Sequence, residues 1–227
     1  MVDPLHGSPW STPATVAGFA QSAPNATLMR FAAEERARGA VRVLDIGCGA
    51  GRNAVPLASA GWNVVAVDLS GPMLGAAAQR VREERPVGRV NLVMAPMEQL
   101  PIASACVDLV IAHGIWNLAR SAAQFRAAVR EAARVARPGA ALFVFTFSRT
   151  TLPESAHPVP GEVFVFTEFS GEPQCFLTEE ELVGELREAG FIRDNSVPLT
   201  EHNRPRQGAL RVGGPPVIYE ATFRRAE

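Results

Sequence analysis

Short runs of apolar residues alternate along this chain with longer segments in which apolar residues recur every three or four positions. The apolar runs predict strands over residues 41–46, 62–67, 90–94, 106–112 and 140–147. The periodic segments predict helices over about 26–38, 52–60, 70–85 and 121–136. Strands that are apolar along their length and separated by helices are typical of a parallel sheet with both faces covered.

Capping and stop signals delimit several of these helices. Ser70 is a candidate N-cap for the helix that follows it, and the Pro-Gly pair at 138–139 is expected to end the helix before the fifth strand. Two pairs have the spacing of a capping box: Ser121 with Gln124, and Thr178 with Glu181.

The last two predicted strands, 191–197 and 217–224, have only a Pro-, Gly- and Arg-rich loop between them. Strands joined without a helix favour antiparallel pairing. The sequence therefore predicts an α/β fold: a Rossmann-like, seven-stranded, mostly parallel sheet with helices on both faces and an antiparallel last strand.

The chain is expected to form a single domain over residues 1–227, with two additions to the alternating pattern. Residues 1–25 are rich in Pro, Ser, Gly and Ala and predict an N-terminal arm. Residues 148–176 form an insertion after a central strand, and within it residues 162–169 alternate as a strand does. Insertions at this place in α/β folds carry substrate-covering elements, so this one is expected to cover the active site.

The sequence VLDIGCGAGRNA, residues 43–54, carries the most specific chemistry. An apolar run ends in Asp45, three glycines follow, and a helix begins. Glycines between a strand and a helix let a ligand lie against the backbone. A second acid, Asp68, ends the next apolar run. Two carboxylates at strand ends around a glycine loop suit an adenosine-containing cofactor with a positively charged end.

A dinucleotide-binding enzyme is the alternative interpretation of the same loop. Gly49, Gly51 and Ala54 satisfy the G-x-G-x-x-A pattern, and Asp68 follows at a suitable distance for a ribose-binding acid. Asp45, however, would repel a pyrophosphate group close to it. An NAD(P)-binding oxidoreductase and a non-catalytic cofactor-binding relative both remain open from the residues alone.

Composition removes other classes of protein. The formal charge is −1, and no apolar run approaches the roughly 20 residues of a membrane span, so neither nucleic acid nor a membrane is an expected partner. All 22 basic residues are arginine, which excludes lysine-based covalent catalysis. Cys48, Cys106 and Cys175 lack metal-ligand spacing, so no metal is expected, and their reduced state suits a cytoplasmic protein. The oligomeric state stays open.

Five segments together resemble the ordered motifs of class I S-adenosylmethionine-dependent methyltransferases. The element GRNA, residues 51–54, is also similar to tellurite-resistance-type and other small-molecule methyltransferases. The five segments are residues 43–54, 64–70, 97–118, 136–147 and 176–191.

The resemblance implies that S-adenosyl-L-methionine is the cofactor and S-adenosyl-L-homocysteine the product. It implies that Asp45 orients the methionine end of the cofactor and that Asp68 accepts hydrogen bonds from the ribose diol. Pro96 departs from the family, which often has an acid there to read the adenine amino group. The remaining implied cofactor contacts are Gly47, Cys48, Gly49, Arg52, Asn53, Leu69, Met73, Met97, Glu98 and His113.

The resemblance also implies in-line transfer of a methyl group to an O, N or S atom of a small molecule. Positioning alone supplies about 7–11 kcal/mol in such reactions. His113, just after the fourth strand, is the candidate general base or orienting group. The candidate acceptor-pocket residues are Trp10, Trp116, Asn117, Arg149 and Phe176.

Overall fold

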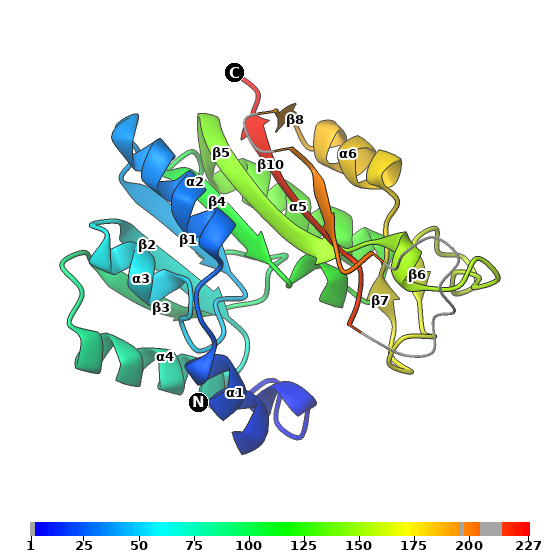
Figure 1. Ribbon diagram of the computed structural model, residues 1–227, viewed down its shortest axis with the longest axis horizontal. Coiled ribbons are helices and arrows are strands. Elements are labelled where there is room, and N and C mark those ends of the chain that lie inside the picture. The colour runs from blue at the N-terminus through cyan, green and yellow to red at the C-terminus, as the bar shows by residue number, and fades with distance from the viewer. Residues whose placement is uncertain (1–2, 196–197, 205–214) are drawn as a thin grey trace.

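A computed structural model describes residues 3–195, 198–204 and 215–227. Its centre is a sheet with the strand order β3-β2-β1-β4-β5-β10-β8, in which β9 also pairs with β10 (Figure 1). The strands are β1 (Arg42–Ile46), β2 (Asn63–Asp68), β3 (Val90–Met94), β4 (Val107–His113), β5 (Ala136–Phe147), β8 (Phe191–Asp194), β9 (Thr200–His202) and β10 (Ile218–Arg225). Strands β1 to β5 are parallel, and β10 runs antiparallel to β5 and to β8. The predicted fold class is therefore confirmed.

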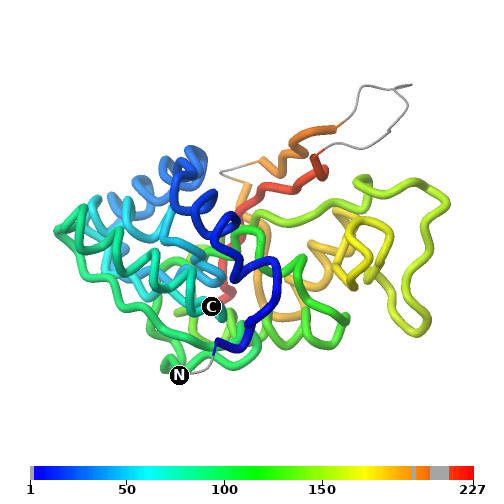
Figure 2. The backbone as a smooth tube through the Cα atoms, turned by 90° about the horizontal axis from the view of Figure 1, so that it is seen from below, coloured from blue at the N-terminus to red at the C-terminus, as the bar shows by residue number. Residues whose placement is uncertain are grey.

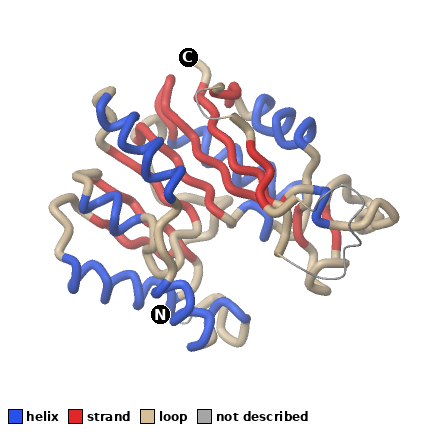
Figure 3. Tube along the Cα trace, viewed as in Figure 1, coloured by secondary structure: helices blue, strands red, loops and turns tan. Residues whose placement is uncertain are grey.

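Helices cover both faces of this sheet, because each face presents apolar side chains (Figures 1 and 3). On one face, Phe31 of α2 and Leu57 of α3 are buried against residues such as Phe143. On the other, Phe125 of α5 and Leu182 of α6 are buried. The helices are α2 (Ala26–Ala37), α3 (Ala54–Ser59), α4 (Gly71–Glu84), α5 (Ala122–Val135) and α6 (Glu179–Glu188). Within the described ranges, none of them combines the length and the apolarity needed to cross a bilayer.

The caps agree with the sequence in part. The Thr178–Glu181 capping box is complete at the start of α6, with both reciprocal hydrogen bonds present. At α5 the Ser121 hydroxyl accepts from the Gln124 backbone N–H, but the Gln124 side chain accepts from the N–H of Arg120. That box is therefore only half formed.

Strand β5 begins earlier than predicted. Residues 138–139 do not end a helix but lie inside β5, which starts at Ala136 immediately after α5. Ala136 pairs with Val107, and the register with β4 then shifts before Leu109. The shift is the local irregularity that admits a Pro-Gly pair into a strand.

The end of the chain contains a strand that the sequence did not predict, β9, within the loop before β10. The preceding strand, β8, ends at Asp194, and the predicted end at residue 197 lies outside the described residues. In the insertion, the predicted strand at 162–169 is reduced to β6 (Val165–Phe166), which pairs with β7 (Gln174–Cys175). Neighbouring residues 164–166 are all buried, so the alternation did not reflect two differently exposed faces.

The arm and the insertion both lie at the carboxyl edge of the parallel strands (Figures 1 and 2). The arm contains a 3₁₀ helix, η1 (Pro9–Ser11), and the helix α1 (Pro13–Gln21). The insertion leaves the sheet through η3 (Arg149–Thr151) and returns beside its starting point, because Ser148 and Leu177 form a parallel bridge and Arg149 N–H donates to the Leu177 carbonyl at 2.7 Å. The arm and the insertion therefore both lie at the carboxyl ends of the parallel strands.

Candidate functional site

A cavity of about 500 Å³ lies at this carboxyl edge, a size typical of small-molecule sites. Its walls come from the arm, the loop after β1, the ends of β2, β4 and β5, and the insertion. It brings together ten of the residues predicted from sequence: Trp10, Gly47, Cys48, Gly49, Arg52, Asn53, Asp68, Met73, His113 and Asn117.

The loop after β1 is held open by its glycines. Gly47 has φ +71°, and a Cβ there would lie 2.7 Å from the Cβ of Ile115, so no larger residue fits. The backbone N–H groups of Gly47 and Cys48 donate to the Val67 carbonyl at 2.8 and 3.0 Å. These bonds fix the bare backbone of the loop against β2 and face it to the cavity.

Asp68 is oriented by the loop it borders. Its two oxygens accept from the backbone N–H of Gly49 and of Ser70, each at 2.8 Å. Burial raises the pKa of this carboxyl, while those two hydrogen bonds oppose the rise. Each oxygen keeps electron pairs for a further donor, so the side chain suits a vicinal diol.

Asp45, also predicted to hold the cofactor, is not among the lining residues but is buried in β1 behind the glycine loop. Its side chain is 1% exposed, and neither oxygen has a hydrogen-bond partner among the described residues. Burial, and to a smaller extent the charge of Asp68, raise the pKa of Asp45 to about 7, while Arg52 opposes this. A buried carboxylate without a partner is costly unless a cation compensates it. A ligand carrying a positive charge over the glycine loop would supply that compensation.

His113 is held as a neutral ring. Burial, together with the positive charge of Arg52, lowers the pKa of His113 to about 3. The Asn25 Nδ2 group, which can only donate, lies 3.2 Å from Nε2. One Arg52 nitrogen lies 3.1 Å from Nε2 and 3.2 Å from Nδ1, so it faces both ring nitrogens. The electron pair of Nε2 is therefore already engaged. This arrangement favours the orienting part of the prediction for His113 over the general-base part.

Asn25, which sequence reasoning missed, connects the site to the rest of the fold. Its Oδ1 caps α2 by accepting from Leu28 N–H at 2.8 Å. Its own N–H donates to Asn53 Oδ1 at 3.0 Å, and its Nδ2 donates to Glu220 Oε1 at 2.8 Å. Glu220, 4% exposed, also contacts His202 Nε2 at 3.0 Å. The only signal for this role in the sequence was the position of Asn25 before a helix.

The arm is fastened to the turn that follows Asp68. Asp3 accepts from the Gly71 N–H at 3.0 Å and from the Ser11 hydroxyl at 2.7 Å. Ser70 Oγ donates to the Trp10 carbonyl at 3.2 Å. The Trp10 ring lies edge-on to Phe19, with centroids 6.0 Å apart, and both line the cavity. The arm therefore forms a wall of the site.

Three predicted acceptor residues do not line the cavity. Trp116 is fully buried against Phe125, with ring centroids 6.0 Å apart. Phe176 is fully buried in a small cluster within the insertion. Arg149 binds backbone carbonyls of the insertion, including that of Ala156 at 2.9 Å. In this structure the three side chains support the walls of the site and do not line it, and their part in binding the acceptor stays a prediction.

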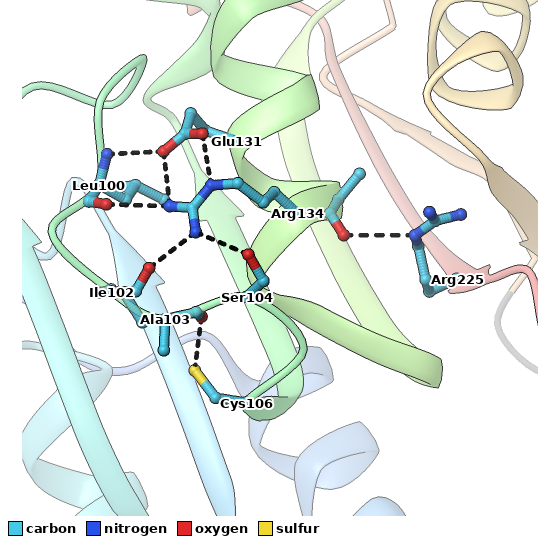
Figure 4. Close-up of polar contacts among 9 residues, drawn as sticks. Leu100, Ile102, Ala103, Ser104, Cys106, Glu131, Arg134 and Arg225 are labelled. Carbon is cyan, nitrogen blue, oxygen red and sulfur yellow. Dashed lines mark hydrogen bonds and ion pairs between the residues drawn. The ribbon is translucent and has the colours of Figure 1, made fainter.

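Four residues predicted at the adenine, Leu69, Pro96, Met97 and Glu98, are also not among the lining residues, and their role stays a prediction. The last three lie in the connection between β3 and β4. That connection is clamped to α5 by Arg134, which donates to the carbonyls of Leu100 and Ile102 at 2.9 and 2.8 Å and pairs with Glu131 (Figure 4).

Several lining residues were not predicted. Apart from Gly114, each has an apolar or amide side chain, which gives no chemical signal of a site. Only their positions, at strand ends or in the arm and the insertion, indicate one. They are Leu5, Phe19, Gly114, Ile115, Leu118, Phe145, Phe147, Phe169 and Gln174.

Comparison with known proteins agrees with this geometry. A family model described as a methyltransferase domain matches residues 43–139. The ubiquinone/menaquinone biosynthesis C-methyltransferase UbiE of Syntrophotalea carbinolica is 32% identical over 170 residues, 67% of this chain and 69% of that protein. The UbiE of Rhizobium leguminosarum is 29% identical over 67% of this chain and 65% of its own length. The chain thus spans about two thirds of these curated relatives.

Among solved structures, the 1,6-didemethyltoxoflavin-N1-methyltransferase of Burkholderia thailandensis, with bound 1,6-didemethyltoxoflavin and S-adenosylhomocysteine, superposes with a TM-score of 0.64. It is 23% identical and covers 89% of this chain and 79% of its own. A SAM-dependent methyltransferase of Methanosarcina mazei has a TM-score of 0.63 at 19% identity, over 82% of this chain and 92% of its own. Both share the fold.

Proposed function

This chain belongs to the class I S-adenosylmethionine-dependent methyltransferases, and on that premise we propose that it methylates a small molecule in the cavity at the carboxyl edge of its sheet. It is an enzyme, and S-adenosyl-L-methionine is its methyl donor. The single observation that carries the proposal is Asp45, a buried carboxylate with both oxygens unpartnered among the described residues, behind a loop of bare backbone.

The residues around the loop would hold the two ends of the donor. Asp45 would compensate its ammonium and sulfonium charges, directly or through water, and Asp68 would accept hydrogen bonds from its ribose diol. Arg52 lines the cavity without an ion pair among the described residues, so its guanidinium is suited to the donor's carboxylate. When bound, the donor would supply a methyl group carried on a sulfonium. The acceptor's electron pair would form the new bond to the methyl carbon, and the electrons of the broken C–S bond would stay on sulfur.

The contribution of the chain is to position the reactants and to exclude water. Trp10 and Phe19 of the arm and Phe169 of the insertion close the cavity from two sides. Holding the reactants in line is worth about 7–11 kcal/mol. His113 is a weak base here, because its Nε2 is engaged, and it acts by orienting Arg52.

We propose an O, N or S atom as the acceptor, because such an atom carries its own electron pair and needs no strong base. A carbon atom activated by a neighbouring hydroxyl is the second candidate, since the curated relatives are named C-methyltransferases. Transfer of ¹³C-labelled methyl groups distinguishes them, because the carbon chemical shift of the product identifies the atom that the methyl is bonded to.

The decisive experiment is calorimetric titration with S-adenosylhomocysteine and, separately, with NAD⁺. We expect micromolar binding of the former and none of the latter. Asp68→Ala is expected to weaken S-adenosylhomocysteine binding by about tenfold or more, about 1.4 kcal/mol, because hydrogen bonds to a charged group are lost. Glu34→Ala, at an exposed position of α2, is the matched control. Binding of NAD⁺ alone would overturn the proposal.

A further inference from the structure

Part of the cavity lining is made of residues that are not assigned to the donor. Phe145 and Phe147 lie two residues apart on β5, so both side chains point to the same side of the sheet. Phe169 of the insertion faces Phe147, with ring centroids 5.5 Å apart at 63°. We call this part the aromatic chamber, defined by Ile115, Asn117, Leu118, Phe145, Phe147, Phe169 and Gln174, all of which line the cavity.

The rings of the chamber are already arranged as stacking surfaces. His113 stacks on Phe145 at 4.0 Å with planes 11° apart, and Phe147 stacks on Phe176 at 5.4 Å. Phe169 remains 40% exposed, although large apolar side chains are normally covered. Faces and edges of aromatic rings at these separations attract a further ring by about 0.5–1.5 kcal/mol beyond area burial. An exposed phenylalanine at the wall of a site therefore indicates a planar aromatic ligand.

Asn117 adds a polar feature to the chamber. It lies in the 3₁₀ helix η2 (Trp116–Leu118), is 2% exposed, and its Oδ1 has no hydrogen-bond partner among the described residues. A buried polar group left unpaired costs about 1–3 kcal/mol. Rotation of the amide by half a turn exchanges its acceptor and its donors, so it can bond either an O–H, an N–H or a carbonyl of a ligand.

The chamber carries no charge of its own. Its seven members are apolar residues and two amides, and the charged residues that line the cavity, Arg52 and Asp68, are assigned to the donor. Gln174 is steered by the Ser170 hydroxyl, which donates to its Oε1 at 3.1 Å. A strongly charged acceptor would lose its hydration here without compensation. The chamber therefore suits an uncharged ring with one or two polar substituents.

We propose that the methyl acceptor is a neutral planar aromatic or heteroaromatic compound, whose ring lies among the phenylalanines of the chamber and whose polar substituent bonds Asn117. This inference rests on the proposed function, because it assigns the acceptor of the same site. It makes Asn117 and Phe169 the specificity-determining residues, with Gln174 as the second amide.

The test measures binding to the complex with S-adenosylhomocysteine, so that no turnover is needed. The probes are matched pairs with the same hydroxyl group on a planar or a saturated frame: 1-naphthol with decahydro-1-naphthol, and 2-naphthol with decahydro-2-naphthol. We expect at least one planar probe to bind with about tenfold or greater preference over its saturated partner, 1.4 kcal/mol. The proposal would be overturned if the two members of each pair bind equally well, or if none of the four probes binds.

Three variants locate the bound probe. Phe169→Ala and Asn117→Leu should each weaken the planar probe by at least about tenfold, with S-adenosylhomocysteine affinity unchanged within about threefold. Gln174→Leu tests the second amide if Asn117→Leu fails to fold. Val163→Ala, an exposed apolar residue of the same insertion, is the control. If S-adenosylhomocysteine itself does not bind, the proposed function fails; if it binds while the variants keep full probe affinity, only the aromatic acceptor fails.

Discussion

The buried carboxyl of Asp45 should lower the stability of the folded protein but favour binding of the donor. This carboxyl is buried without a hydrogen-bond partner among the described residues, and burial raises its pKa to about 7. A carboxyl whose pKa is higher in the folded than in the unfolded chain holds its proton more tightly when folded. The stability that this bound proton contributes is therefore fully present at a pH below 3.8, the ordinary pKa of an aspartic acid. It is lost as the pH rises through the folded-state pKa of about 7.

Replacing this acid should stabilise the empty protein. Asp45→Asn removes the buried charge, so at about pH 8 we expect the free energy of unfolding to rise by at least about 1 kcal/mol, or roughly 2–4 °C in melting temperature. Near pH 4 the wild-type carboxyl is protonated in the fold, and the gain should disappear. Scanning calorimetry at the two pH values measures the difference. A variant less stable than wild type at pH 8 would mean that Asp45 has a compensating partner.

The same substitution should weaken donor binding. Wild-type affinity for S-adenosylhomocysteine is expected to rise with pH through about 7, as Asp45 loses its proton and becomes able to compensate a cation. Asp45→Asn should bind about tenfold more weakly at pH 8 and lose this pH dependence. Titration calorimetry across this range provides the measurement, and a pH profile retained in the variant would assign it to another group.

The arm should report donor binding, because it forms a wall of the cavity. Of the three tryptophans, Trp62 and Trp116 are at most 1% exposed, whereas Trp10 is half-buried and lines the cavity. A change in tryptophan fluorescence on addition of S-adenosylhomocysteine should therefore come from Trp10. We expect Trp10→Phe to abolish the change while affinity falls by less than about tenfold, because an aromatic wall is kept.

Trp62→Phe, at a core position away from the cavity, serves as the control and should retain the signal. A full fluorescence change in Trp10→Phe would show that the arm does not respond to the donor.

The connection between β3 and β4 depends on one guanidinium. Arg134→Met removes the hydrogen bonds to the Leu100 and Ile102 carbonyls, so we expect a loss of about 1–3 kcal/mol in the free energy of unfolding by denaturant. Arg130→Met, exposed on the same helix, should cost much less. If Met97 and Glu98 contact adenine, Arg134→Met should also weaken S-adenosylhomocysteine binding. An unchanged affinity would indicate that these two residues do not contact the cofactor.

Across the fold, Asn25 ties the arm, α2, β10 and the site into one network. Asn25→Ala removes a helix cap and leaves Glu220 without one of its donors, so we expect a loss of about 1–3 kcal/mol in stability. Glu220→Leu removes the same contact from the other side. Combined, the two changes should cost less than the sum of their separate effects by at least about 0.5 kcal/mol. Strict additivity in denaturant titrations would contradict a shared network.

The sheet could be predicted from sequence because its central parallel strands, β1, β2, β4 and β5, are buried along most of their length and therefore appear as apolar runs. The glycine loop and its two acids were also predictable, since Gly47 has a conformation and a clearance that only glycine meets. Thr178 and Glu181 identified the start of α6 because their bonds are local. The capping box and the positive φ of Gly47 are local features of the chain, and for that reason the sequence alone displays them.

The chamber was not predictable for the opposite reason. Phe145 and Phe147 have the same apolar character as the core residues of β5, and only the packing of the insertion turns them into walls. Trp116 and Phe176 show the converse, since both are fully buried, Trp116 in the main core and Phe176 in the small cluster of the insertion. Strand β9 was missed because it is short and depends on pairing with β10, which is a tertiary contact.

The bridge between Ser148 and Leu177 has a consequence for how such an enzyme changes its chemistry. A chain segment that departs from and rejoins the scaffold at adjacent points can be exchanged at two splice points, as long as its replacement again covers the core where Phe164 packs on Phe125. New acceptors can then be acquired by swapping or lengthening that segment, while the machinery that grips the donor is inherited unchanged.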